Sequence, residues 1–156
     1  MSLAAGNIAR VNAGTGKADA SRAGLTPRDV VDFALKRHAV LTELHTGRVR
    51  PAEVCDAQAY LKLAARHYGE STGSSCPVCE GSGLRRVHYV YGDNLGTVAG
   101  QAKHASELPG LAERVEEFRV YLVEVCNDCG WNHLIRTFVL GHGRASGRGM
   151  KSAADG

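Results

Sequence analysis

Two short cysteine motifs carry the clearest chemistry in this sequence. They are CPVC at residues 76–79 and CNDC at residues 126–129, each followed closely by a glycine, Gly81 or Gly130. Two intervening residues let one tight turn direct both sulfur atoms toward one point, and glycine suits the left-handed backbone at its exit. Four thiolates close a tetrahedral shell around Zn²⁺ and leave no position for water or substrate. We therefore predict one structural zinc ion with four ligands: Cys76, Cys79, Cys126 and Cys129.

The spacing between the two motifs is unusually long. The 46 residues at positions 80–125 separate them, whereas roughly 15 to 20 residues are typical of a compact zinc site. An insertion is therefore expected between the two cysteine turns. A pair of redox dithiols is the alternative, but a thioredoxin-like CxxC begins a helix after a strand. Here glycine-containing segments follow both motifs, which favours metal binding.

Length and composition indicate one modest domain. The chain has 156 residues, of which 44% are hydrophobic, as expected for a globular protein. It contains no apolar run of about 18 residues that would suit a membrane span. The first 24 residues lack the apolar centre of a secretory signal. We therefore predict a cytoplasmic protein, whose reduced thiols favour metal ligation over disulfides.

The formal net charge of +3 is unevenly distributed. Residues 25–140 carry thirteen Lys or Arg against fourteen Asp or Glu, so the positive excess lies in the two tails. Binding to a phosphate backbone usually requires a basic face. Net charge therefore gives no support for a nucleic-acid surface in the central region.

The N-terminal half predicts a helical hairpin. Residues 1–24 are rich in small and polar residues and are expected to form a disordered tail. Thr26 and Pro27 suit a helix start, and apolar residues at helical spacing predict a helix over residues 27–46. Pro51 opens a second predicted helix that ends near residue 68. Because the link is short, we expect these helices to form an antiparallel hairpin within residues 25–70.

The C-terminal half predicts a zinc ribbon over residues 71–140. β-branched and aromatic residues predict three antiparallel strands at residues 84–91, 118–125 and 131–140. The insertion, about residues 93–117, is expected to hold a short helix. The Gly-rich basic segment 141–156 is expected to be disordered. The expected fold is therefore α+β, with the helical hairpin packed on a three-stranded antiparallel zinc ribbon.

Cys55 lies outside both CxxC motifs, within the second predicted helix. A small buried apolar side chain is one interpretation. A fifth thiol near the metal and a redox-sensitive residue are the other two.

Aromatic and basic residues on the predicted strands form a candidate interaction surface. Such residues can stack on bases or anchor a protein partner, although they also suit packing within a small sheet. The candidate residues are Arg85, Arg86, Tyr89, Tyr91, Arg119, Tyr121, Trp131 and His133. No Ser-His-Asp set, HExxH motif or carboxylate pair is recognisable, so we predict that the protein is not an enzyme.

Several short segments of the sequence resemble those of one known group of proteins. They are VVDFALKR, EVCDA, CPVC, YGDNLG and VEVCNDCGWNHLIRTFVLG, which lie between Val30 and Gly141. They resemble a family of uncharacterised actinobacterial proteins, a domain of unknown function with a four-cysteine motif of the zinc-ribbon type. The resemblance implies the four cysteines as metal ligands and draws attention to Cys55 and Asp56 and to Gly92 and Asp93. It implies no activity.

These observations lead to one expected function and two alternatives. The expected function is a non-catalytic zinc-ribbon binding module, an accessory or regulatory factor of the transcription or translation machinery. Its partner would be a protein complex, with RNA polymerase or the ribosome as the best candidates, and no membrane or small-molecule substrate is indicated. The alternatives are a direct nucleic-acid-binding protein and a thiol redox sensor that uses Cys55.

Overall fold

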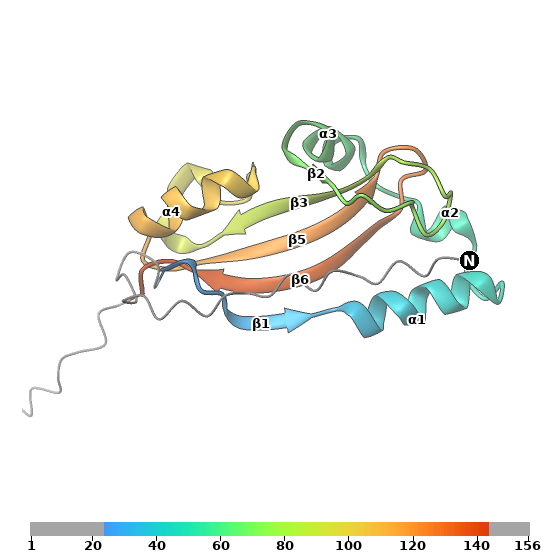
Figure 1. Cartoon of the computed structure of the whole chain (residues 1–156), viewed down its shortest axis with the longest axis horizontal. Helices are drawn as coiled ribbons and strands as arrows, with labels where there is room; N and C mark the ends of the chain where they lie inside the picture. The colour runs from blue at the N-terminus through green and yellow to red at the C-terminus, as the bar shows by residue number, and fades with distance from the viewer. Residues whose placement is uncertain (1–23, 144–156) are drawn as a thin grey trace, which may run out of the picture.

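A six-stranded antiparallel sheet organises the protein. The computed structural model describes residues 24–143 (Figure 1), so most of both predicted disordered tails lies outside the described residues. The strand order is β1-β6-β5-β3-β2, and β4 pairs with β3 beside this path. The strands are β1 (Arg28–Asp32), β2 (Glu70–Ser71), β3 (Leu84–Tyr91), β4 (Ala102–Lys103), β5 (Phe118–Cys126) and β6 (Asn132–Leu140).

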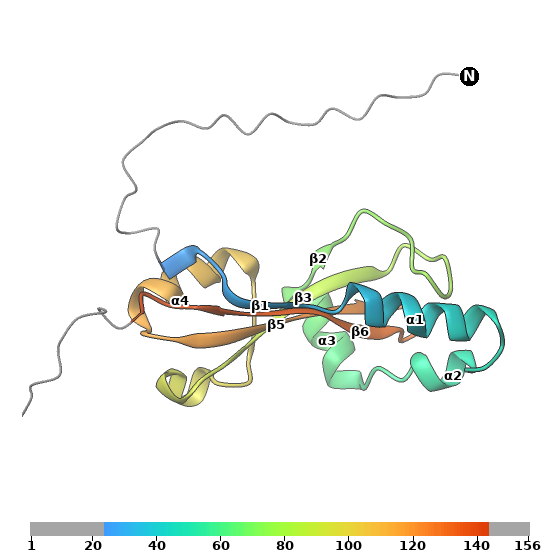
Figure 2. The same ribbon diagram turned by 90° about the horizontal axis from the view of Figure 1, so that it is seen from below.

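Short helices connect and cover these strands. They are α1 (Ala34–His45), α2 (Pro51–Val54), α3 (Ala59–Tyr68) and α4 (Leu108–Arg114), with the 3₁₀ segments η2 (Asp93–Val98) and η3 (Ala105–Glu107). Figure 2 shows α3 and α4 on opposite sides of the sheet. Helix α3 packs on Val87 and Val125 through its buried Ala65, whereas Leu108 and Leu111 of α4 belong to the cluster around Val90 and Val120. Both faces of the sheet are therefore partly covered.

The predicted three-stranded ribbon was wrong, because the sheet has six strands. The three expected strands are present as β3, β5 and β6, and their antiparallel pairing is confirmed. Strand β1 adds to the free edge of β6, with Val31 opposite Thr137, and β2 and β4 add to β3. The larger sheet buries more apolar surface than a ribbon would, because a core cluster lies on each face.

The first predicted helix begins later than the sequence pattern indicates. Residues 28–32 form β1, and the Oδ1 atom of Asp32 accepts a hydrogen bond of 2.7 Å from the backbone N–H of Ala34 at the start of α1. That bond, and a second one from Arg136, hold the pKa of Asp32 below its usual value. The five-residue segment RDVVD is too short for periodicity to separate a helix from a strand. Residues 28–32 form a strand because they pair with β6.

The second predicted helix is interrupted by hydrogen bonds to residues near the turn between β5 and β6. Helix α2 ends at Val54, and α3 begins only at Ala59. Between them, the backbone N–H of Ala57 donates to the carbonyl of Gly130 at 3.0 Å, and Asn132 donates to Asp56 at 2.9 Å. These bonds replace the hydrogen bonds of a continuous helix. The expected helical hairpin packed as one unit on a ribbon is therefore wrong, because the helical segments pack separately around one sheet.

Candidate metal centre

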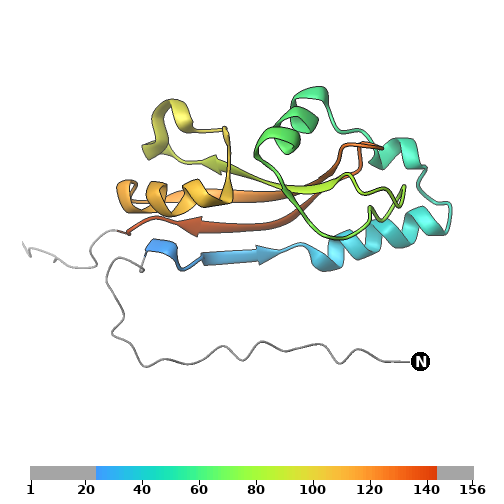
Figure 3. The same cartoon turned by 45° about the horizontal axis from the view of Figure 1, so that its top comes forward.

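The four cysteines of the two CxxC motifs meet at one end of the sheet. Cys76 and Cys79 lie in the segment between β2 and β3, Cys126 ends β5, and Cys129 lies in the turn before β6. Figure 3 shows this segment beside the β5–β6 turn. The four Sγ atoms all lie within 4.8 Å of one another. The expectation that the two motifs come together is confirmed, and the four thiols form a possible metal site.

The two cysteine turns have the same backbone hydrogen bonds. The N–H of Glu80 donates to the carbonyl of Cys76 at 3.0 Å, and that of Gly130 donates to Cys126 at 2.9 Å. The last residue of each turn is left-handed, with φ of 62° at Glu80 and 89° at Gly130. The sequence pattern suggested Gly81 for this role in the first turn. The structure assigns it to Glu80 instead.

Backbone N–H groups also point at the sulfur atoms. Val78 donates to Cys76, Gly81 to Cys79, and Trp131 to Cys129, each at 3.4 Å. Such bonds favour the thiolate over the thiol. They also fix the orientation of the sulfur atoms, as hydrogen bonds to metal-binding side chains commonly do.

The pKa values of the four thiols follow their surroundings. Burial raises the pKa of Cys76 and Cys126 and raises that of Cys129 to about 12. The backbone hydrogen bond from Gly81 lowers the pKa of the exposed Cys79. Most of these thiols therefore hold their protons until a cation replaces them, so metal binding here releases protons and weakens as the pH falls.

The Asp128 carboxylate links the two turns by a hydrogen bond that does not involve a metal ion. The N–H of Gly83 donates to its Oδ2 atom at 3.0 Å, and the N–H of Asn127 donates to the carbonyl of Gly83 at 3.0 Å. A Cβ atom at Gly81 or Gly83 would lie 2.5 or 2.6 Å from that same carboxylate oxygen. A side chain at either position would therefore displace the Asp128 carboxylate and disturb its hydrogen bond to Gly83.

Cys55 lies against the four-cysteine cluster. Its Sγ atom is 3.6 Å from the Sγ atom of Cys129 and is placed to donate a hydrogen bond to it. Cys55 is half-buried and packs with the buried cluster that includes Cys126 and Trp131. Of the three interpretations of Cys55, the structure favours a fifth thiol beside the cluster.

The backbone at Cys55 packs closely against Gly130 in the second turn, and a substitution of Gly130 tests this contact. A Cβ atom there would lie 3.0 Å from the carbonyl oxygen of Cys55, whereas one at Gly47, with a similar φ of 76°, would meet nothing within 4 Å. Both Gly→Ala changes carry the left-handed penalty of about 1–2 kcal/mol. Gly130→Ala is expected to cost about 1–2 kcal/mol more. Urea denaturation of the two variants measures this difference, and equal losses would contradict the close approach.

A buried carboxylate adjoins the second turn, and sequence reasoning did not find it. Glu124 is 2% exposed. Its Oε1 atom accepts hydrogen bonds from Nε and Nη2 of Arg37 at 3.0 and 2.8 Å and from Nε1 of Trp131 at 2.9 Å. In the sequence Glu124 is one acid among the alternating residues of a strand, and Arg37 lies 87 positions away. Only the assembled fold brings these three groups together.

The predicted interaction surface is not one surface. Tyr91 lies opposite Arg119 in the β3–β5 pairing and Tyr89 lies opposite Tyr121, so these four share one face of the sheet. Arg86 lines a hollow with Glu124 and Leu122, residues that alternate with Tyr121 along β5 and so lie on the other face.

The remaining three residues of that predicted surface have local roles. Arg85 donates a hydrogen bond of 3.1 Å to the carbonyl of Gly69. Trp131 is fully buried, so it is not an exposed anchor for a partner. The ring of His133 stacks on that of Trp131, with centroids 5.8 Å apart.

The fold and the cysteine cluster together define the class of protein. It is an α+β protein with a six-stranded antiparallel sheet and a cluster of four thiols suited to a metal ion. Within residues 24–143, every helix is too short or too polar to cross a lipid bilayer.

The comparisons with known proteins then give the family. Residues 25–154 match the model of a family of unknown function, DUF5318, and the chain belongs to this family. It is similar to uncharacterised proteins of Mycobacterium bovis and of two Mycobacterium tuberculosis strains. Each is 45% identical over 114 residues, which cover 73% of this chain and 83% of the relative. No solved structure matches the chain significantly.

Proposed function

We propose that the protein is a non-catalytic binding module stabilised by one zinc ion. The four sulfur atoms within 4.8 Å of one another carry this proposal. Thiolate ligands favour zinc over magnesium, calcium or manganese. Four of them fill a tetrahedral shell, so the bound ion would have no open position for a substrate. Cys76, Cys79, Cys126 and Cys129 hold the ion in this proposal, and its contribution is to the folding free energy.

The proposed partner is a protein complex of the transcription or translation machinery in the cytoplasm. The reduced thiols that the metal site requires support this compartment. The choice of machinery rests on analogy with other small zinc-binding modules, which is a fold-level argument.

Affinity capture tests the choice of partner. Zinc-loaded, tagged full-length protein is exposed to a native mycobacterial lysate, and bound proteins are identified by mass spectrometry. The Cys126→Ser variant, which is expected to lose zinc and to unfold at that end of the sheet, shows which captured proteins require the intact site. Enrichment of RNA polymerase or ribosomal subunits by the native protein alone supports the proposal. Their absence from both samples removes this choice of partner.

A second candidate function is a thiol redox sensor, favoured by the 3.6 Å between the sulfur atoms of Cys55 and Cys129. With zinc bound, Cys129 would be a thiolate, which attacks a peroxide and becomes a sulfenic acid, while the released hydroxide takes up a proton to form water. The Cys55 thiol then attacks the sulfenic sulfur, a disulfide forms, and a second water molecule leaves. The disulfide removes one of the four ligands and so weakens metal binding.

The redox candidate is tested by treating the zinc-loaded protein with one equivalent of hydrogen peroxide. Zinc release, followed with a colorimetric chelator, is expected to be about tenfold faster in the native protein than in Cys55→Ala, because a neighbouring thiol traps the sulfenic acid. Peptide mapping should find residues 55 and 129 joined by a disulfide. Equal release rates, or a disulfide that excludes Cys55, would rule out this sensor.

A further inference from the structure

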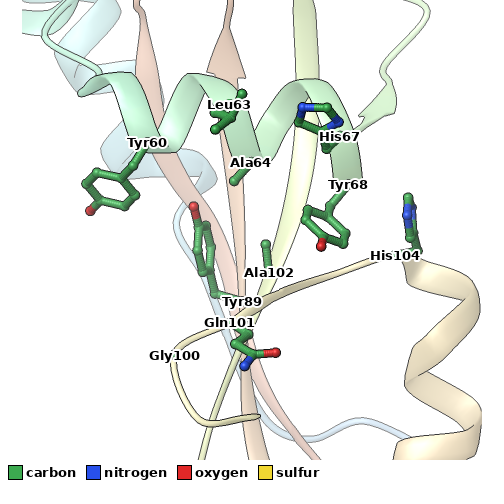
Figure 4. A pocket seen from close by; sticks show the side chains of 10 residues that line it. All are labelled: Tyr60, Leu63, Ala64, His67, Tyr68, Tyr89, Gly100, Gln101, Ala102 and His104. Atoms are coloured by element: carbon green, nitrogen blue, oxygen red, sulfur yellow. The ribbon is translucent and has the colours of Figure 1, made fainter. Parts of the chain in front are cut away.

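The five tyrosines of the chain gather around one groove. Tyr60 and Tyr68 come from α3, Tyr89 and Tyr91 from β3, and Tyr121 from β5. They line two adjoining hollows of about 650 and 690 Å³, which share Tyr60, Tyr89 and Gly100. Figure 4 shows the first hollow, with residues of α3 on one side and Tyr89 and Gln101 on the other. The groove therefore runs between α3 and the sheet.

Three rings of this tyrosine groove, those of Tyr60, Tyr68 and Tyr91, are exposed, and ring contacts position two of them, Tyr68 and Tyr91. Tyr60 is 65% exposed, Leu63 52% and Tyr91 46%. The Tyr91 ring meets that of Tyr121 edge-on, with centroids 5.1 Å apart, and the Tyr68 ring lies 4.9 Å from that of His104. Exposed apolar surface of this kind commonly marks a binding site. Because the rim side chains are so exposed, the groove suits an extended ligand better than an enclosed small molecule.

The groove has no formal charge of its own. Among the described residues that line its two hollows, none is Asp, Glu, Lys or Arg. Its polar groups are phenol hydroxyls, the amide of Gln101 and the imidazoles of His67 and His104. A nucleic-acid strand needs cations along its phosphates, and the lining supplies none. The chemistry instead suits an uncharged ligand that offers hydrogen-bond acceptors.

We propose that the tyrosine groove binds a proline-rich segment of a partner protein in the polyproline II conformation. Such a segment has three residues per turn and leaves its carbonyl groups free. Its rings pack on aromatic side chains, and its carbonyls accept hydrogen bonds from groups such as phenol hydroxyls. Successive turns would occupy the two hollows. The proposal rests on the proposed role as a binding module and names the chemical class of partner segment.

Fluorescence anisotropy with a fluorescein-labelled peptide of ten prolines tests this proposal. Zinc-loaded full-length protein is expected to bind it with a Kd below about 1 mM. Tyr60→Ala and Tyr91→Ala should each weaken binding about tenfold, as removal of an aromatic anchor does. Tyr60 is 65% exposed and Tyr91 46%, so thermal melting should show only a small change in stability, and a smaller one for Tyr60→Ala. Leu35→Ala is the matched control, because Leu35 is 86% exposed on α1 and outside the groove.

Four outcomes would overturn the groove proposal, and the first three concern the peptide and the tyrosine variants. They are no binding at about 1 mM peptide, equal binding by a labelled Gly-Ser peptide of the same length, and equal affinities of the tyrosine variants and the native protein. Tight binding of a ten-thymidine oligonucleotide in place of the peptide would also overturn it, in favour of nucleic acid. Peptide binding without capture of RNA polymerase or ribosomal subunits would retain the groove and reject only that choice of partner.

Discussion

The Cys126→Ser variant is expected to lose stoichiometric zinc and to unfold at the end of the sheet that carries both cysteine turns. Cys126 is fully buried and packs with Leu41, Leu84 and Trp131. A serine there would place a hydroxyl in an apolar cluster and would remove one of the four ligands. Structural zinc contributes about 10–16 kcal/mol to the folding of small zinc domains, which is comparable to the whole stability of about 5–15 kcal/mol for a typical protein.

Two measurements check this expectation. Elemental analysis should give one zinc ion per native chain and much less than one per Cys126→Ser chain. Thermal unfolding followed by circular dichroism should show a large fall in Tm for the variant, and chelator treatment of the native protein should reproduce it. Cys55→Ser is the matched control, because Cys55 lies outside both CxxC motifs and is expected to leave the zinc content at one. A native protein that is reduced, well folded and free of metal would contradict both the zinc site and its proposed role.

The parts of the fold that the sequence predicts well are those that depend on local pattern. Strands β3, β5 and β6 are predicted because alternating β-branched and aromatic residues continue for eight or nine residues. The clustering of the four cysteines is predicted because each CxxC places two sulfur atoms within one turn. Both inferences use residues that are neighbours in the chain.

The parts that the sequence does not predict depend on distant residues. Strand β1 exists because residues 28–32 pair with β6, more than 100 positions away. The break between α2 and α3 exists because Ala57 donates to Gly130. The tyrosine groove likewise needs α3 to lie across β3 and β5. Helical periodicity therefore gives the wrong structure where an early segment has a partner late in the chain.

The second large expected effect is a loss of stability in Arg37→Met, which removes the ion-pair partner of the buried Glu124 carboxylate. The side chain of Glu124 is 2% exposed and that of Arg37 is 28% exposed, and Arg37 gives the carboxylate two of its three described hydrogen bonds. Removing one partner of a buried ion pair typically costs about 3–5 kcal/mol, because the other charge stays buried without its counterion. We expect a loss of about 3 kcal/mol, since Arg37 is partly exposed and water can replace some of its contacts.

A double-mutant cycle distinguishes the ion pair from simple loss of packing. Glu124→Gln removes the charge but keeps an oxygen that can accept the hydrogen bond from Trp131. In that background Arg37→Met should cost less than about 1 kcal/mol, which gives a coupling energy of at least about 2 kcal/mol. Urea denaturation of zinc-saturated protein under reducing conditions provides all four free energies of unfolding.

Arg136→Met is the matched control for this cycle. Arg136 also pairs with a carboxylate, that of Asp32 at 3.2 Å, but both side chains are about half exposed. Water screens such a pair, so its loss should change stability much less than Arg37→Met does. If the two arginine variants lost equal stability, or if the cycle gave no coupling, the Arg37–Glu124 pair would not stabilise the fold. The stability of this end of the sheet would then come from packing around Trp131 and the four cysteines.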